Sequence, residues 1–336
     1  MENTVLVTGG AGYIGSHIVV ELAAAGHAPI VLDNFANSSR AVLPRLEALT
    51  GRPVPCIEAD VRDAGALRRA FDDDAVASVI HCAGLKAVGE SQAQPLAYYD
   101  VNVTGALVLL QAMREAGVAT IVFSSSATVY GEPERVPVAE DAAIAAHSVY
   151  GRTKLIIEEI LRDLAHAEPS WRVAILRYFN PAGAHPSGRI GEAPLGRPNN
   201  LVPLLCRIAG GEFPELSVFG TDWPTPDGTG VRDYIHVQDL AAGHVAALEH
   251  LAEHTGTTTL NLGAGKGYSV REVVSEFERA CGRTIPRSFV PRRPGDVACV
   301  YADPARANAL LGWRATRGLD VICTDAWRWQ QGGGRY

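Results

Sequence analysis

The segment that most constrains the fold of this chain is TVLVTGGAGYIG, residues 4–15. A short run of β-forming residues, Thr4–Thr8, leads directly into a glycine-rich turn, and a helical pattern begins at Tyr13. One glycine allows the tight turn, another lets the main chain approach a bound group, and the last lets the helix pack against the strand. The free N–H groups at the start of such a helix favour an anion. We therefore expect a strand–turn–helix unit whose turn binds phosphate groups.

Units of the same kind continue through the first half of the chain. Further runs are apolar throughout, which predicts strands buried on both faces of a sheet: Pro29–Asp33, Pro53–Glu58, Val76–His81, Thr120–Ser124 and Arg172–Arg177. Helical patterns alternate with them, at Tyr13–Ala25, Ser38–Leu49, Leu67–Phe71 with its flanks, Pro95–Ala116 and Tyr150–His166. Such alternation gives right-handed crossovers and a parallel sheet. The predicted fold class is α/β, with a Rossmann-type doubly wound parallel sheet and a smaller α/β substrate-binding domain.

The second half is less regular and indicates a second domain. Residues 180–200 are rich in proline, glycine and histidine, as in a functional loop. Helices are expected at Leu201–Ala209, Val237–Leu251, Val270–Ala280, Pro304–Leu311 and Leu319–Gln330, and a strand at Thr258–Leu262. We expect a nucleotide-binding domain over residues 1–180, rejoined by segments around 232–262, and a mainly substrate-binding domain over residues 181–336. The tail GGGRY is expected to fray.

The composition excludes several classes of protein. The net charge of −7 argues against a nucleic-acid partner, and no apolar run reaches the roughly 18 residues of a membrane span. The start, MENTVLVTGG, lacks the basic and long apolar stretches of a signal peptide. Six cysteines are widely spaced without a Cys-x-x-Cys pair, which favours reduced thiols and a cytoplasmic location.

An acidic residue indicates which phosphate-bearing ligand the turn accepts. Asp33 ends the second strand, 18 residues after Gly15, where a carboxylate bonds a ribose 2′-hydroxyl in units of this type. The same carboxylate repels a 2′-phosphate, so NAD is favoured over NADP. Asp60 and Val61, after the third strand, fit a contact to the adenine edge. Two alternatives stay open: Asp33 is a turn residue, and Asp60 is a helix cap.

A tyrosine and a lysine indicate proton transfer. Tyr150 and Lys154 are four residues apart on an expected helix and share one face. A nearby ammonium and the positive ring of oxidised NAD stabilise a phenolate. Ser126, at the end of the fifth strand, can pass or hold the substrate proton. An isolated pair of this kind is most often an ordinary surface pair, but the glycine turn and Ser126 favour catalysis.

Stretches over almost the whole chain carry a family resemblance: TGGAGYIGSH, VLDNF, VIHCAGLKAVGES, FSSSATVYGE, YGRTK, LRYFNPAGAHPSG, PNNLVP, DGTGVRDYIHV, NLGAGKGYSV and PRRPGD. In them the chain resembles the UDP-glucose 4-epimerases of the extended short-chain dehydrogenase/reductase family. The resemblance implies reversible C4 epimerisation of UDP-glucose and UDP-galactose through a 4-keto intermediate with bound NAD. It also implies a homodimer formed through Pro95–Ala116 and Tyr150–His166. One departure is Cys82, where VIHFAG is usual; it affects the packing beside the cofactor.

The resemblance also implies roles for individual residues. Tyr150 is the base, with Ser126 and Lys154 as its catalytic partners. The NAD-binding residues are Gly9, Gly12, Tyr13, Ile14, Gly15, Asp33, Asn34, Asp60, Val61, Cys82, Ala83, Gly84, Lys86, Asn102, Ser124, Tyr150, Lys154 and Tyr178. The residues that bind the UDP-sugar are Lys86, Ser126, Tyr150, Asn180, Asn199, Asn200, Leu201, Ser217, Phe219, Arg232, Tyr234, Arg293, Asp296 and Val300.

The chemistry of the second half agrees with these roles. Arg232 and Arg293 come from distant loops, and guanidinium groups suit a diphosphate held from two sides. Surface ion pairs are the alternative for both arginines, and turn formation is the alternative for the asparagines. His250 and His254 share a helix face, but no third ligand is evident, so no metal is expected.

Val300 follows the PRRPGD motif, at the place where the resemblance puts the residue that sets the size of the sugar pocket. A small side chain there leaves room for an acetamido group at C2, which predicts that N-acetylated UDP-hexoses are also substrates. The alternative is that Val300 is an ordinary core residue.

Other functions remain open. A 4-epimerase of a UDP-uronic acid or a UDP-pentose is the nearest. A sugar-nucleotide 4,6-dehydratase would carry Asp-Glu in place of Ala127-Thr128. A non-catalytic NAD-sensing protein would need neither Tyr150 nor Lys154.

Overall fold

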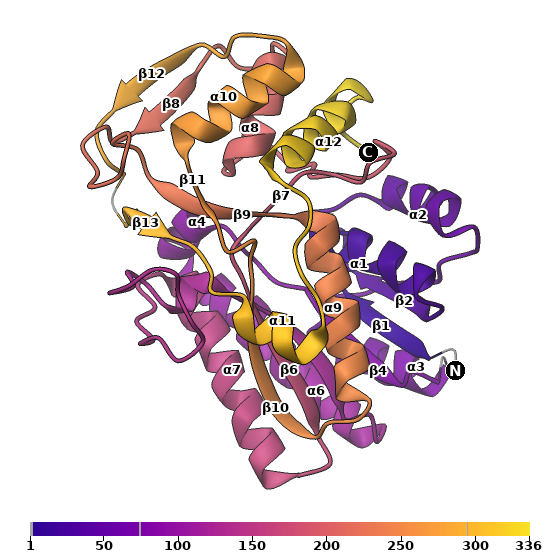
Figure 1. The fold of residues 1–336 in the computed structure, drawn as a ribbon. Helices are drawn as coiled ribbons and strands as arrows, with labels where there is room; N and C mark the ends of the chain where they lie inside the picture. Colours follow the sequence, from indigo (N-terminus) through magenta and orange to yellow (C-terminus); the bar gives the residue numbers. More distant parts are fainter. Residues whose placement is uncertain (1–2, 74, 294) are drawn as a thin grey trace.

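The computed structural model describes residues 3–73, 75–293 and 295–336; Pro294 of the PRRPGD motif lies outside these ranges. Its centre is a seven-stranded parallel sheet with the order β10-β6-β5-β4-β1-β2-β3 (Figure 1). The strands are β1 (Thr4–Thr8), β2 (Ala28–Asp33), β3 (Cys56–Glu58), β4 (Ser78–His81), β5 (Thr120–Ser126), β6 (Arg172–Tyr178) and β10 (Gly256–Leu262). The strand order reverses between β1 and β4, which confirms the predicted doubly wound sheet.

Helices cover both faces of this sheet. One face carries α1 (Tyr13–Ala24), α2 (Leu43–Thr50) and α9 (Val237–Leu251), and the other carries α3 (Ala64–Asp73), α6 (Gly105–Glu115) and α7 (Val149–Ala167). Val5 and Val7 of β1 belong to the core under α1, whereas Leu6 belongs to the core under α3 and α6. Because both faces are covered, β1 is buried along nearly its whole length, as its continuous apolar sequence predicts.

A second group of elements lies above the carboxyl ends of the sheet (Figure 1). Helices α8 (Leu201–Ala209), α10 (Val270–Cys281) and α12 (Leu319–Gln331) share an apolar core of their own. Strand β9 (Val231–His236) pairs with β7 (Asn180–Ala182), β11 (Gly267–Ser269) and β13 (Cys299–Val300), and β8 (Leu216–Phe219) pairs with β12 (Arg287–Val290). Helix α11 (Ala305–Leu311) packs against α9 and β10.

The expected helix over Pro95–Ala116 is divided in the structure. It consists of α5 (Pro95–Tyr98), a π-helical stretch η2 (Tyr99–Thr104) and α6, preceded by a short helix α4 (Val88–Ala93). The expected Ser38–Leu49 helix is likewise a 3₁₀ turn η1 (Arg40–Val42) followed by α2. The π-helical stretch contains Asn102, whose buried side chain bonds to Leu85 and Thr153. Tertiary hydrogen bonds therefore accompany the change in helical pitch.

The prediction that the tail frays is wrong. Within the tail, Tyr336 is partly buried, and its hydroxyl donates to the Gly191 carbonyl at 3.1 Å. The Tyr336 ring lies 5.1 Å from the Trp329 ring, and the Arg45 guanidinium lies 5.0 Å from the Tyr336 ring centroid. These contacts of Tyr336 hold the glycine-rich tail in place.

In the described residues no helix is both long and apolar enough to cross a membrane.

A buried ion pair fastens α7 to the sheet. The two oxygens of Glu158 accept hydrogen bonds from Arg177 of β6 at 3.0 and 2.7 Å, and Ser125 of β5 donates to the same carboxylate at 2.5 Å. Both Glu158 and Arg177 are buried. Burial raises the pKa of Glu158, but the hydrogen bonds from Arg177 outweigh burial and hold that pKa below its ordinary value. Removal of one partner would leave the other charge buried alone, which is costly.

We expect Glu158→Ala to lower the free energy of unfolding by about 3–5 kcal/mol, since the Arg177 guanidinium then lies buried without its partner. Urea denaturation followed by circular dichroism measures the change. The control is Glu159→Ala, which removes an exposed acid paired with Arg162 and should cost about 1 kcal/mol or less. Equal losses for the two variants would contradict the assignment.

Candidate active site

Glycines shape the turn after β1. Gly9 has a φ of +69°, and a Cβ there would lie 2.8 Å from the Ala83 nitrogen in the loop after β4. A Cβ on Gly15, in the first turn of α1, would lie 2.2 Å from the Gly9 carbonyl oxygen. Side chains at these positions would force the turn away from both neighbours. The turn therefore packs against α1 and the β4 loop at once.

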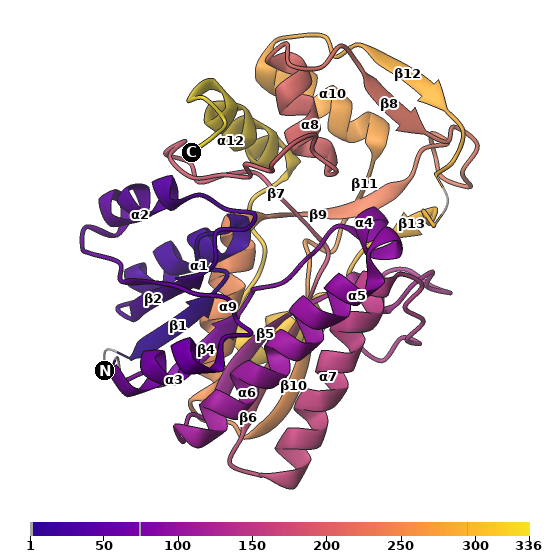
Figure 2. The ribbon, with the colours of Figure 1, turned by 180° about the vertical axis from the view of Figure 1, so that it is seen from behind.

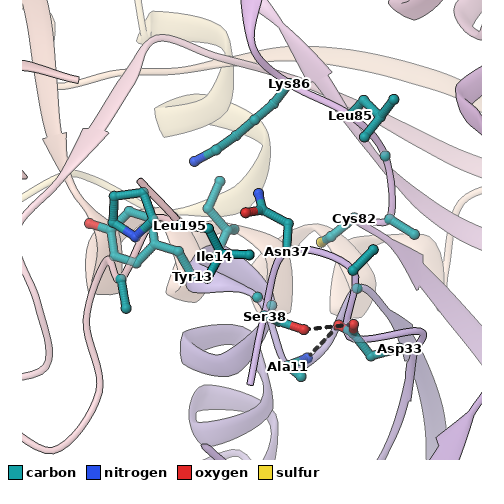
Figure 3. Close-up of a pocket in the computed structure, with 18 of the residues that line it drawn as sticks. Ala11, Tyr13, Ile14, Asp33, Asn37, Ser38, Cys82, Leu85, Lys86 and Leu195 are labelled. Carbon is teal, nitrogen blue, oxygen red and sulfur yellow. Dashed lines mark hydrogen bonds between the residues drawn. The ribbon is translucent and has the colours of Figure 1, made fainter. Parts of the chain in front are cut away.

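Asp33 connects this turn to the end of β2. Its Oδ2 accepts a hydrogen bond from the Ala11 N–H at 3.0 Å, and its Oδ1 accepts one from the Ser38 hydroxyl at 2.8 Å (Figure 3). The Phe35 N–H donates to Oδ1 at 2.9 Å. Asp33 is buried. The carboxylate thus holds the turn by hydrogen bonds, in agreement with the alternative interpretation of Asp33 as a turn residue. It also places a negative charge at the cavity wall.

A cavity of about 960 Å³ opens at the carboxyl ends of β1, β2, β4 and β5. This is the place where the strand order reverses, and doubly wound sheets bind their ligands there. Every predicted NAD-binding residue except Asn102 lines the cavity. The cavity wall also includes residues 191–197 and the tail residues Arg335 and Tyr336.

Asn102 lies behind the cavity wall. Its side-chain oxygen accepts from the Leu85 N–H at 2.8 Å, and its amide nitrogen donates to the Leu85 carbonyl at 3.1 Å and to Thr153 at 3.0 Å. It is 1 % exposed. Through these bonds Asn102 positions the Gly84–Lys86 loop against α7.

Asp60 lies in a polar cluster at one end of the cavity. It accepts hydrogen bonds from Asn34 at 2.8 Å and from the Arg62 side chain at 2.8 Å. The bonds from Arg62 hold the pKa of Asp60 well below its usual value. The Arg62 main-chain N–H also donates to Asp60 at 2.9 Å, which closes a local turn. The alternative that Asp60 caps a helix is wrong, because α3 begins at Ala64 and the Ala66 N–H donates to Asp63 instead.

Tyr150 and Lys154 lie in the first turns of α7, at the cavity wall. The α7 N-terminus is capped by Ser148, whose side-chain oxygen accepts from the Gly151 N–H at 3.0 Å. Lys154 Nζ donates to the Ser124 carbonyl at 2.7 Å and lies 5.9 Å from the Tyr150 ring centroid. The capped helix and the end of β5 thus bring the phenol and the ammonium together.

Burial dominates the protonation of this pair. It raises the pKa of Tyr150 to about 12, and a hydrogen bond with Ser126 acts in the opposite direction. It also lowers the pKa of Lys154 to about 8. Ser126 does not line the large cavity; its oxygen accepts two hydrogen bonds from Thr128, which leaves its own proton available for Tyr150. In both cases burial disfavours the charged form of the side chain.

The partly buried Cys82 begins a chain of polar groups whose other members are buried. The Ser124 hydroxyl donates to Cys82 Sγ at 3.0 Å and also contacts the Tyr178 hydroxyl. The Tyr178 hydroxyl in turn contacts His244 Nε2, whose ring bonds to the Leu240 carbonyl through Nδ1 at 2.8 Å. Burial lowers the pKa of His244 to about 4 and raises that of the Cys82 thiol to about 11. Cys82, which departs from the aromatic residue that the resemblance leads us to expect, is therefore a neutral thiol bonded to Ser124.

Four of the predicted UDP-sugar residues lie on β9 and on strands that pair with it: Arg232, Tyr234, Asn180 and Val300. Asn180 of β7 pairs with Tyr234, and Val300 of β13 pairs with Arg232. Only Lys86 and Tyr150 of the predicted substrate residues also line the large cavity. Val300 is half-buried and packs against the apolar cluster that includes Phe179, which agrees in part with its interpretation as a core residue.

Near the end of β8, the Arg293 guanidinium lies 5.4 Å from the exposed Phe219 ring and bonds to Asp296 at 2.9 Å. Ser217 belongs to β8 and pairs with β12. Arg232 donates to the Val231 carbonyl at 2.8 Å. Both predicted diphosphate-binding arginines thus have partners within the chain, and Arg293 forms the surface ion pair of the alternative interpretation.

Asn199, Asn200 and Leu201 lie at the start of α8. Asn200 has the N-cap position, but its side chain makes no cap bond; instead its Nδ2 donates to Glu192 Oε1 at 2.8 Å. Asn199 is exposed.

The sequence patterns missed Glu192, Arg207 and Tyr336. All three line the cavity. The Arg207 guanidinium donates to the Pro194 carbonyl at 2.7 Å and so holds the loop of the cavity wall. The only signal for Glu192 was an acidic residue in a loop rich in proline and glycine, and nothing in the sequence pointed to the tail.

In the described residues, no group of three or more His, Cys, Asp and Glu side chains is arranged to hold a metal ion.

Comparison with known proteins identifies the family. Residues 5–263 match the model of the NAD dependent epimerase/dehydratase family. The UDP-glucose 4-epimerase of Bacillus subtilis (strain 168) is 56% identical, over 97% of this chain and 96% of that protein. The chain belongs to the UDP-glucose 4-epimerases of the NAD dependent epimerase/dehydratase family. Membership confirms NAD as the predicted cofactor.

Solved structures of this epimerase family have the same fold. UDP-glucose 4-epimerase from Bifidobacterium longum in complex with NAD+ and UDP has a TM-score of 0.96 and 49% identity, over 99% of both chains. The enzyme from Stenotrophomonas maltophila, with bound NAD and formylated UDP-arabinopyranose, has a TM-score of 0.97 and 49% identity, again over 99% of both chains.

The residues of the cavity fit NAD. The turn at the start of α1 lines the cavity, has no room for a Cβ at Gly9 or Gly15, and leads into a helix N-terminus, which favours an anion. Asp33 lies at the end of β2, and the Tyr150–Lys154 pair lies along the wall formed with β5. These are the features that a pyrophosphate, a ribose and a nicotinamide require.

We expect the protein to bind NAD at least about 100-fold more tightly than NADP, because the Asp33 carboxylate would face the 2′-phosphate. Reconstitution of cofactor-free protein with each dinucleotide, followed by titration calorimetry, measures the ratio. Equal affinity, or equal activity with NADP, would remove Asp33 from its role in cofactor selection.

Proposed function

We propose that this chain interconverts UDP-glucose and UDP-galactose by inversion at C4 of the hexose. The observation that carries the proposal is the buried contact of Lys154 with the end of β5, which keeps a cation beside the Tyr150 ring in a cavity fit for NAD. The identity to named UDP-glucose 4-epimerases supports the choice of substrate.

Bound in the cavity, NAD supplies the acceptor and then the donor of the hydride at C4. Side chains of the protein accept the proton and later return it. Tyr150 accepts the proton of the 4-hydroxyl, directly or through Ser126, and later returns it. Its pKa of about 12 in the chain alone means that the phenolate needs positive charge nearby, and Lys154 provides part of it.

Two kinds of binding are required if the same site is to work on both faces of the sugar. The nucleotide must stay fixed, and Arg232, Arg293 and Lys86 offer positive charge for its diphosphate. The sugar must turn between the two hydride transfers, so the pocket around it has to be loose. Asn180, Asn199, Asn200, Leu201, Ser217, Phe219, Tyr234, Asp296 and Val300 are the further substrate residues that we propose.

We also propose that different parts of the chain bind the cofactor and the substrate. Residues 1–180, together with segments around 232–262, bind NAD, and residues 181–336 bind mainly the UDP-sugar. The parallel pairing of β10 with β6 and the packing of α9 on α1 support the inclusion of the later segments.

A cytoplasmic homodimer is the assembly that we propose. Figure 2 shows α5, α6 and α7 along one side of the sheet. Apolar side chains are exposed there: Leu96 on α5 is 82% exposed, Leu107 on α6 40% and Ile156 on α7 37%. A second copy would cover them. The six free thiols agree with a reducing compartment.

A coupled assay of UDP-galactose with purified protein tests the proposed function. UDP-glucose should form without net consumption of NAD. UDP-uronic acids and UDP-pentoses in the same assay test the alternatives. Faster conversion of either, or no conversion of any sugar, would contradict the proposal.

Tyr150→Phe should keep the fold and the bound NAD but lower kcat by about 10²–10⁴-fold, because it removes the general base. The UDP-galactose assay and the cofactor content measure both effects. A variant with more than about a tenth of wild-type turnover would exclude Tyr150 as the base.

Val300 should admit N-acetylated sugars, since a small side chain leaves space beside C2. We expect the wild type to convert UDP-N-acetylgalactosamine and Val300→Tyr to lose that activity selectively by steric clash. The measurement is kcat/KM for the plain and the N-acetylated sugar with both proteins. Refusal of the N-acetylated sugar by the wild type, or its unchanged use by the variant, would show that Val300 is not the gate.

A further inference from the structure

Glu192 holds two predicted ligand-binding residues through one oxygen. Lys86 Nζ lies 3.2 Å from Glu192 Oε1, and Asn200 Nδ2 donates to the same oxygen at 2.8 Å. Lys86 belongs to the loop after β4, and Asn200 lies at the start of α8. The carboxylate therefore bridges the central sheet and the second group of elements at the cavity wall.

The rest of Glu192 is fixed by the fold. Trp329 Nε1 donates to the Glu192 carbonyl at 3.2 Å, and the Tyr336 hydroxyl accepts from the Gly191 N–H at 3.2 Å. A Cβ on Gly191 would lie 2.6 Å from the Trp329 ring, so the chain is tightly packed there. The Glu192 side chain is only 9% exposed. The main chain around Glu192 is thus held by the fold, and its carboxylate is a built-in feature of the cavity wall.

The two partners of Glu192 can move. The Lys86 side chain is 48% exposed and extends into the cavity toward Tyr13, whose ring centroid lies 5.9 Å from Nζ (Figure 3). Asn200 is exposed as well. A lysine on its flexible stem changes partners easily. Lys86 and Asn200 can therefore leave the carboxylate for an anion that enters the cavity.

We infer that Glu192 competes with the diphosphate of the UDP-sugar for Lys86 and Asn200, and so limits how tightly the nucleotide is held. The inference rests on the proposed function, because the UDP-sugar brings the diphosphate. Like charges face each other once the phosphates recruit Lys86, which favours release of the nucleotide. A reversible enzyme needs such release after every turnover.

The test is UDP binding to the NAD-loaded protein by titration calorimetry. Glu192→Gln keeps an acceptor oxygen for Lys86 and Asn200 but removes the charge, so UDP affinity should rise by about fivefold. Uridine carries no phosphate, and its affinity should not change. With UDP-galactose as substrate, KM and kcat should both fall, because the product leaves more slowly.

Glu215→Gln is the matched control, since it also removes one negative charge, from an exposed acid bonded to Ser288. It should bind UDP and uridine as the wild type does. Unchanged or weaker UDP binding by Glu192→Gln would overturn the inference, as would an equal gain for uridine or a change in bound NAD alone. If the wild type binds UDP but does not convert UDP-galactose, the proposed function fails, while the UDP measurements still decide the role of Glu192.

Discussion

The hydrogen bond from Lys154 to the Ser124 carbonyl joins the parts on which the site depends. It brings a buried cation on α7 to the carboxyl end of β5, at the edge of the cavity. Tyr150 lies one turn earlier on the same helix, so its place follows from that contact. Burial disfavours the charged form of Lys154, so the arrangement depends on α7 staying in place against the sheet. Glu158, one turn further along α7, does this through its buried pair with Arg177.

The wall of the cavity that the turn after β1 forms also depends on close packing. The turn after β1 has no space for side chains at Gly9 and Gly15, and the Asp33 carboxylate bonds to its Ala11 N–H. Asn102 likewise holds the Gly84–Lys86 loop from behind. The cofactor side of the site is thus rigid. The Lys86 side chain of that loop and Asn200 at the start of α8 are exposed and share one acceptor, which suits a substrate that must enter and leave.

Much of this arrangement could be predicted from the sequence, for physical reasons. The five inner strands of the main sheet are largely apolar because both of their faces are covered, and this pattern predicts the fold class. The glycine turn, Asp33 and the Tyr150–Lys154 pair depend on spacing along one or two elements, which a sequence displays directly. The cavity accordingly contains nearly all of the residues expected to bind NAD.

The remainder depends on contacts between distant segments. Strand β9 is central to the second group only because β7, β11 and β13 come to it from other parts of the chain. The bond from Asn102 to Leu85 accompanies a π-helical stretch inside an expected helix. The role of Glu192 depends on its ion pair with Lys86. The position of Tyr336 depends on its contacts with Gly191 and Trp329. A local sequence pattern cannot predict contacts between residues that lie so far apart in the chain.

In the mechanism that we propose, a hydride leaves C4 of the hexose and the same hydride returns to the other face. Conversion of C4-deuterated UDP-galactose in ordinary water tests it most directly, with the product examined by NMR and mass spectrometry. We expect the UDP-glucose that forms to keep its deuterium at C4. Loss of the deuterium to water during conversion would contradict it, because the hydrogen would then leave C4 as a proton exchangeable with solvent.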